Sequence, residues 1–329
     1  MRVGLTYDLK SEYLKEGFSV EETSEFDRDS TIDGIEQALR TLGYETDRIG
    51  HVKQLAARLV SGERWDLVFN ISEGIYGIGR EAQVPCLLDA YKIPYTFSDP
   101  LVLSLTLHKG MTKRIIRDAG LNTPDFCVIT KEEEISSVHL PYPLFVKPVA
   151  EGTGKGISGK SKVTSAEELP RICKDLLQRY PDGLIVEEFL PGREFTVGIT
   201  GTGAKSRTVG LMEIVYKHAA AKEIYSLDTK SNYEALVEYT VPEKEVAEAC
   251  FQLALSTWQV LGCRDGGRVD IRYDRNGNPS FIEVNPLAGL DHIHSDLPIL
   301  AYRNGYTYTW LIGEIMNSAI ERLMHTQTA

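Results

Sequence analysis

Two β-prone runs near the C-terminal end of the chain bring acidic, amide and cationic side chains together. The runs span residues 268–273 and 280–285, and a turn with Asn276-Gly277 separates them. An Asn-Gly pair is typical of a two-residue type I′ hairpin loop, because both of its positions need a positive φ. Strand residues alternate between two faces, so pairing outward from this turn predicts which side chains face one another. The predicted pairs on one face are Asp270 with Glu283 and Arg268 with Asn285.

This hairpin face has the composition of a metal site. Two carboxylates directly opposite each other repel unless a cation lies between them. Asp270, Glu283 and Asn285 offer only oxygen ligands, which suit a hard ion such as Mg²⁺ that also holds phosphate oxygens. Arg268 adds a planar, positively charged guanidinium group that can bind the same phosphates. The alternative interpretation is a solvent-facing hairpin with ordinary surface charges.

A glycine-rich run lies upstream and has two interpretations. Residues 154–161 fit the phosphate-loop pattern G-x-x-x-x-G-K-[ST], which would indicate a P-loop NTPase. A true P-loop leads directly into a helix, whereas residues 161–164 are β-prone and the helix signal begins at Ser165. We therefore favour a β-turn-β loop over residues 151–156, which follows Lys147-Pro148 and can fold over triphosphate oxygens.

Periodicity predicts the elements that must position these residues. Strand and helix signals alternate over the first hundred residues as βαβαβ, which indicates a parallel sheet. The predicted strands span 2–7, 44–49, 67–71, 126–129, 144–147, 157–163, 184–186, 194–200, 208–216, 267–273 and 280–284. The predicted helices span 29–43, 52–60, 109–119, 165–180, 244–261 and 308–324, with a further helical stretch opened by Asp99-Pro100. The acidic segment 8–29 lacks periodicity and is interpreted as a solvated surface loop, with a lid or subunit contact as the alternative.

Composition excludes several classes of protein. The 329 residues are 42% hydrophobic and 25% charged, as in soluble globular proteins of more than one domain. A formal charge of -11 repels nucleic acid and anionic membranes, and no apolar run approaches the length that spans a bilayer. Five scattered cysteines without a Cys-x-x-Cys pair argue against disulfides or zinc and favour a reducing, cytoplasmic location.

The ordered set of motifs resembles the ATP-grasp superfamily and, within it, the D-alanine:D-alanine ligase family. The likeness runs from Phe69-Asn70 to Pro298. Its elements are Ile93-Pro94-Tyr95-Thr96, Lys109 opening a helix, Lys147-Pro148, the Glu151-Gly152 loop, the run from Val186 to Thr196, Arg268-x-Asp270 and Glu283-x-Asn285.

The resemblance implies a fold and a division of the chain. The fold would be α/β and α+β, a three-domain ATP-grasp fold with a Rossmann-like N-terminal domain. Residues 1–100 would form the N-terminal substrate domain, 101–186 the central ATP lid, and 187–329 the C-terminal domain with the metal and substrate sites. The family's habit suggests a homodimer.

The resemblance also assigns roles to residues. ATP would be bound by Lys109, Lys147, Glu151, Gly152, Thr153, Gly154, Glu187, Phe189, Leu190 and Glu194. Lys230 would reach the terminal phosphate, while Arg268 and the backbone N–H of Gly289 would stabilise an oxyanion. Two Mg²⁺ ions, with Mn²⁺ as an alternative, would complete the site. The implied reaction converts a carboxylate into an acyl phosphate, which an amine then attacks.

The substrate half departs from the family. The Glu-His-x-Val-Ser element after the first strand is absent, and Ser72-Glu73-Gly74 replaces a His-Gly pair. The candidate substrate residues are Glu73, Tyr233, Asp291, His294 and Ser295. We therefore expect a ligase that joins two amino acids, or an amino acid and a small carboxylic acid, which need not be D-alanine. The alternatives are a P-loop-type NTPase and a nucleotide-binding regulatory protein without ligase activity.

Overall fold

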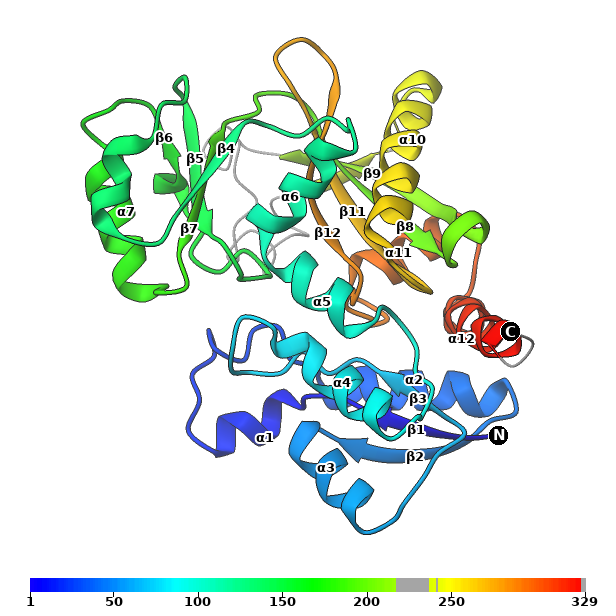
Figure 1. Ribbon diagram of the computed structural model, residues 1–329. Helices are drawn as coiled ribbons and strands as arrows, with labels where there is room; N and C mark the ends of the chain where they lie inside the picture. Colours follow the sequence, from blue (N-terminus) through cyan, green and yellow to red (C-terminus); the bar gives the residue numbers. More distant parts are fainter. Residues whose placement is uncertain (217–236, 241, 327–329) are drawn as a thin grey trace.

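The computed structural model describes residues 1–216, 237–240 and 242–326, and in this part the chain folds around three β-sheets (Figure 1). Two sheets lie side by side in the upper half of the view, and the third lies below them. The short 3₁₀ helices are η1 (Arg80–Ala82), η2 (Glu132–Ser137), η3 (Gly159–Ser161) and η4 (Gly203–Lys205). No helix in the described ranges is long and apolar enough to cross a membrane.

The N-terminal sheet confirms the predicted βαβαβ pattern. Strands β1 (Arg2–Thr6), β2 (Glu45–Gly50) and β3 (Leu67–Asn70) pair in parallel in the order β2-β1-β3. Its helices are α1 (Lys10–Lys15), α2 (Asp29–Thr41), α3 (Val52–Val60) and α4 (Gln83–Ala90). All four β3 residues are buried, as expected for a parallel strand that is covered on both faces.

The second sheet carries one of the two walls of the site. Strands β4 (Phe126–Ile129), β5 (Leu144–Pro148), β6 (Lys162–Val163) and β7 (Leu184–Glu188) have the order β4-β7-β5-β6, and α7 (Leu169–Arg179) packs on one face. The strand predicted over 157–163 is wrong except at its last two residues, because η3 replaces it. The helix predicted from Ser165 begins only at Leu169, because residues 165–168 form a turn, in which the Glu168 carboxylate accepts from Thr164 N at 3.0 Å.

The third sheet carries the predicted hairpin. Strands β8 (Glu194–Thr200), β9 (Arg207–Tyr216), β10 (Val237–Thr240), β11 (Gly266–Tyr273) and β12 (Pro279–Asn285) pair antiparallel in the order β10-β9-β8-β11-β12. Helix α10 (Lys244–Leu261) packs on the face that Val197 and Val269 present, and α11 (Asp296–Arg303) packs over Gly198 on the opposite face.

Three further helices join the units. Helices α5 (Pro100–Leu107) and α6 (Lys109–Asp118) lead from the N-terminal sheet to the other two (Figure 1). The last helix, α12 (Tyr308–Thr326), returns to pack against α2. Ile315 and Met316 therefore share one apolar core with Ile32 and Leu39, which ties the end of the chain to its beginning.

The acidic segment 8–29 is packed, so its interpretation as a solvated surface loop is wrong. Tyr13 and Phe26 are buried with ring centroids 4.6 Å apart. The backbone N–H of Lys10 donates to Asp27 O at 2.9 Å, which closes the segment on itself. Part of the segment's charge is buried with the aromatic residues, since Asp8 is 1% exposed and accepts from the Tyr13 hydroxyl.

Candidate functional site

The hairpin face has the predicted register, although the predicted turn is wrong. Asp270 lies opposite Glu283, and Arg268 lies opposite Asn285. The loop has three residues rather than two, because Asp274 N donates to Asn278 O at 2.9 Å and Gly277 alone in it has a positive φ. A bulge between Asp270 and Ile271 then shifts the pairing by one residue. The two single-residue offsets cancel, which restores the alignment of the acids.

Each acid of the pair has a cation beside it. Asp270 forms an ion pair with Arg268 and accepts from Thr196 Oγ1 at 2.9 Å. Glu283 lies 3.7 Å from the Lys109 ammonium. Burial favours the neutral form of Arg268, but Asp270, Asp296 and Glu283 outweigh this effect and raise its pKa. The hairpin face thus brings acidic and basic side chains together where they are largely shielded from solvent.

The donor set fits a metal that is shared with phosphate. Within the described ranges no three His, Cys, Asp or Glu side chains converge as a metal cluster. An ion on the hairpin face would therefore have two carboxylates and the Asn285 amide, leaving coordination positions for ligand oxygens. Magnesium typically binds in this way.

A first cavity opens between the second and third sheets. Its walls come from β5 and β7 on one side and from β11 and β12 on the other. The predicted ATP-site residues that line it are Lys109, Lys147, Glu151, Gly154, Glu187, Phe189, Leu190 and Glu194. Asp270 and Glu283 line it too, together with Lys155 and Arg272, which the motifs did not indicate. Gly152 and Thr153 are not on its wall.

Three buried charges lie at this cavity: Glu187 and Lys147 line it, and Lys113 lies behind Glu187. The Glu187 carboxylate lies 3.0 Å from Lys113 Nζ and 2.9 Å from Lys147 Nζ. Lys113 is fully buried and also donates to Thr123 Oγ1 and Phe281 O. Lys113 was missed by sequence reasoning, although its position one helical turn after Lys109 was a usable signal.

Burial and ion pairing shift the pKa values of these groups in opposite directions. Burial lowers the pKa of Lys113 to about 8. Burial also acts to lower the pKa of Lys147, but Glu187 and Glu283 outweigh it and raise this pKa. Burial acts to raise the pKa of Glu187, but the two lysines hold it below its usual value. Two lysines that share one carboxylate leave one positive charge in excess, which suits an anionic ligand.

A second cavity, of about 570 Å³, lies beside the first one, at the end of the hairpin that carries Arg268 and Asn285. It lies between the N-terminal unit and the loop that follows β12. The predicted residues on its wall are Glu73, Thr153, Arg268, Asn285, Gly289, Asp291, His294 and Ser295. The two cavities share the hairpin, since Asp270 and Glu283 border the first while Arg268 and Asn285 border the second. Lys230 and Tyr233 lie outside the described residues.

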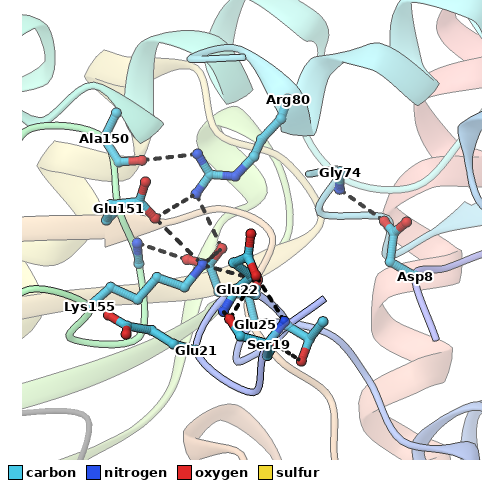
Figure 2. Close-up of polar contacts among 12 residues, drawn as sticks. Asp8, Ser19, Glu21, Glu22, Glu25, Gly74, Arg80, Ala150, Glu151 and Lys155 are labelled. Atoms are coloured by element: carbon cyan, nitrogen blue, oxygen red, sulfur yellow. Dashed lines mark hydrogen bonds and ion pairs between the residues drawn. The ribbon is translucent and has the colours of Figure 1, made fainter. Parts of the chain in front are cut away.

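The glycine-rich loop is fastened to the acidic segment (Figure 2). Gly152 N donates to Glu25 Oε1 at 2.8 Å, and Glu25 Oε2 lies 3.1 Å from Lys155 Nζ and 3.2 Å from Arg80. The Glu25 side chain is only 7% exposed. Glu151 lies 3.6 Å from Arg80 and 3.5 Å from Lys155. No motif marks Glu25, because 127 residues separate it from Gly152 and 130 from Lys155.

The P-loop interpretation does not fit the geometry. Lys160 is exposed and belongs to η3, and Ser161 leads into strand β6. The next helix begins at Leu169, so no helix N-terminus completes a phosphate cradle at Gly154 to Ser161.

Comparisons with known proteins agree with this architecture. The model of the family "D-ala D-ala ligase C-terminus" matches residues 115–317. The D-alanine–D-alanine ligase of Aquifex aeolicus is 32% identical over 284 residues, covering 86% of this chain and 92% of its own. An uncharacterised protein of Sinorhizobium fredii, y4sG, is 32% identical over 305 residues, covering 88% of this chain and 87% of its own.

Solved structures extend the likeness to the whole fold. The D-alanine–D-alanine ligase of Bacillus anthracis superposes with a TM-score of 0.76 at 22% identity, covering 99% of both chains. Its complex with ATP gives 0.73 at 23% identity over the same coverage. The chain therefore has the ATP-grasp fold and belongs to the D-alanine–D-alanine ligase family.

Proposed function

We propose that the protein is an ATP-dependent carboxylate–amine ligase that joins two amino acids, or an amino acid and a small carboxylic acid. The observation that carries this proposal is the pair of cavities that meet at one hairpin face. One cavity has lysines suited to a triphosphate, and the other has polar walls suited to amino acids. The substrate wall differs from the family pattern, so the substrates need not be D-alanine.

The proposed reaction has two steps. A carboxylate oxygen of the first substrate attacks the terminal phosphorus of ATP, and ADP leaves. The amine of the second substrate then attacks the acyl phosphate carbon, inorganic phosphate leaves, and the amine loses a proton. Water must be excluded in between, because it would hydrolyse the acyl phosphate. The loop held by Glu25 lies where it could close the site.

The described side chains suit these steps. Lys109 and Lys147 would neutralise phosphate charge, and Arg268 with the Gly289 N–H would stabilise the oxyanion that forms when the amine attacks. Asp270, Glu283 and Asn285 would hold Mg²⁺, which shields the charge of the transferring phosphoryl group. A role for Lys230 at the terminal phosphate stays a prediction.

Other expectations also stay proposals. We propose domains at 1–100, 101–186 and 187–329, and a cytoplasmic homodimer that acts on small molecules rather than on nucleic acid or membranes. The Glu187 carboxylate is held by two lysines, and a contact of this residue with adenine remains a prediction.

Product formation tests the proposal directly. The protein is incubated with ATP, Mg²⁺ and mixtures of D- or L-amino acids, while ADP and phosphate are assayed and products are sought by mass spectrometry. We expect amino acids to stimulate ADP release and to yield a condensed product. If no mixture raises ADP release above the rate with ATP alone, ligation of free amino acids is ruled out.

Paired lysine variants separate this proposal from the P-loop alternative. Lys147→Ala removes a cation from the wall of the first cavity and should reduce kcat/KM for ATP at least roughly a hundredfold, as loss of one charged contact allows. Lys160→Ala changes an exposed side chain and should leave kcat/KM within about twofold. The reverse order of effects would support the P-loop interpretation.

A further inference from the structure

Two carboxyl groups on the wall of the second cavity lack partners. Asp27 and Glu73 both line this cavity, and neither makes a side-chain hydrogen bond or ion pair in the described part of the chain. The other acids on the wall are engaged. Glu25 pairs with Arg80 and Lys155, and Asp291 accepts from Thr31 Oγ1 and two backbone N–H groups. Glu21 accepts from the Tyr180 hydroxyl, and Asp296 lies 3.8 Å from the Arg268 guanidinium. Asp27 and Glu73 are thus the carboxyls available to a ligand.

Both groups are partly buried on the cavity wall. Burial raises the pKa of Asp27 to about 8, with Asp8 and Asp291 adding to the effect. Burial raises the pKa of Glu73 well above its usual value, and the nearby acids Glu81, Glu25 and Asp27 raise it further. A partly buried carboxyl without a partner is unfavourable, and a bound cation would relieve that penalty.

A third polar group lies on the same wall. The Ser24 hydroxyl oxygen is buried and has no hydrogen-bond partner among the residues described. Ser24 comes from the same packed segment as Asp27. A buried hydroxyl without a partner is uncommon in folded proteins, and at this cavity wall a ligand or a water molecule would supply the partner.

The presence of two carboxyl groups without partners, rather than one, indicates the class of ligand. One carboxyl would match the α-ammonium group that every amino acid carries. The second needs another positive charge, because the attacking amine of the second substrate must be neutral to react. Cationic Lys10 and Arg28 line the same cavity and could meet substrate carboxylates, so the wall offers both signs of charge.

We propose that one substrate is a diamino acid, an amino acid with a second positively charged group on its side chain, and that Asp27 and Glu73 together recognise its two ammonium groups. This inference rests on the proposed ligase function and narrows its substrate class. It assigns specificity to residues of the N-terminal unit that the family motifs do not include.

Matched amino acids test this inference. Ornithine and norleucine have side chains of equal length that end in an ammonium and a methyl group respectively, and both carry the α-ammonium group. Each enantiomer is titrated into the full-length protein by calorimetry with ADP and Mg²⁺, and each is assayed as a ligase substrate. We expect ornithine to bind at least roughly tenfold more tightly than norleucine, as a charge-assisted hydrogen bond allows.

Isosteric variants locate the effect. Asp27→Asn and Glu73→Gln remove charge with little change of shape and should each reduce the ornithine-to-norleucine ratio at least roughly fivefold. Glu16→Gln, which changes an exposed acid of the same segment, should leave the ratio unchanged. Thermal unfolding of each variant verifies that it is folded.

The outcomes are separable from those of the proposed function. Equal or tighter binding of norleucine, or a ratio that both variants leave unchanged, would overturn the diamino-acid inference while ligation of other amino acids could still occur. Failure of every amino acid to stimulate ADP release would overturn the ligase function, whereas the binding ratio would still decide the specificity of the cavity.

Discussion

Lys113 Nζ lies 3.0 Å from one oxygen of the Glu187 carboxylate, and the other oxygen lies 2.9 Å from Lys147. Lys113 comes from α6, whereas Glu187 comes from β7 of the second sheet. Lys113 also donates to Phe281 O on β12. This one ammonium therefore joins helix α6 to both walls of the first cavity, so the shape of the cavity depends on a buried contact.

Replacement of this buried lysine should destabilise the protein. Lys113→Met keeps the volume but removes the ammonium beside Glu187, which also donates to Thr123 Oγ1 and Phe281 O; Phe281 O then keeps only Thr123 as its donor. We expect the free energy of unfolding to fall by about 2–4 kcal/mol, near the lower end for a broken buried pair, because Glu187 keeps Lys147. Denaturant unfolding measures this change. Lys160→Met is the exposed control and should stay within about 0.5 kcal/mol; equal effects of the two variants would contradict the structural role of Lys113.

Loss of the Glu25 charge should loosen the glycine-rich loop. Glu25→Gln weakens its ion pairs with Arg80 and Lys155 and its bond from Gly152 N. Hydrogen exchange in residues 150–156 should become at least roughly tenfold faster, since each 1.4 kcal/mol of lost protection is a factor of ten. Glu22→Gln, an exposed neighbour, is the control. Unchanged exchange in the Glu25 variant would show that other contacts hold the loop.

Stability should depend on pH through a buried acid of η1. Burial raises the pKa of Glu81 to about 8, with Glu25 adding to the effect while Arg80 and Lys109 oppose it. The folded state then binds more protons than the unfolded state between about pH 4.5 and 8, so the free energy of unfolding should fall as pH rises through this window. In the Glu81→Gln variant, the total decrease in the free energy of unfolding between pH 5 and pH 8 should be smaller by at least about 1 kcal/mol. Denaturant titrations at pH 5, 6, 7 and 8 measure it, and an identical slope in the variant would refute the assignment.

Removal of one hairpin carboxylate should weaken metal dependence. Asp270→Asn leaves Glu283 as the only acid of the facing pair and should raise the Mg²⁺ concentration for half-maximal activity at least roughly tenfold. Activity as a function of Mg²⁺ concentration measures this shift. Asp274→Asn alters an acid in the turn of the same hairpin and should not change it. A common response of both variants would mean that the hairpin fold, rather than the charge, was affected.

Local patterns in the sequence were sufficient for much of the fold. Alternating periods predicted the parallel βαβαβ unit, and strand β8 and helix α10 have the predicted bounds. These signals are reliable because apolar residues recur along the buried face of an element, about every 3.6 residues in a helix and every second residue in a strand. The motifs also predicted that Lys147 binds ATP and that Asp270 and Glu283 hold its metal, and the three side chains line one cavity.

Only the tertiary structure decided how distant segments meet. The acids of the hairpin align because a three-residue loop and a bulge offset each other, and neither is specified by the Asn-Gly pair alone. Glu25 reaches Gly152 because Tyr13 and Phe26 anchor its segment, and Asp27 faces a cavity for the same reason. The sequence determined which charges the chain carries and on which elements they lie. Packing determined which of those charges are paired and which are left for a ligand. Such pairing depends on contacts between segments that are far apart in the sequence, and these contacts leave no periodic pattern in it.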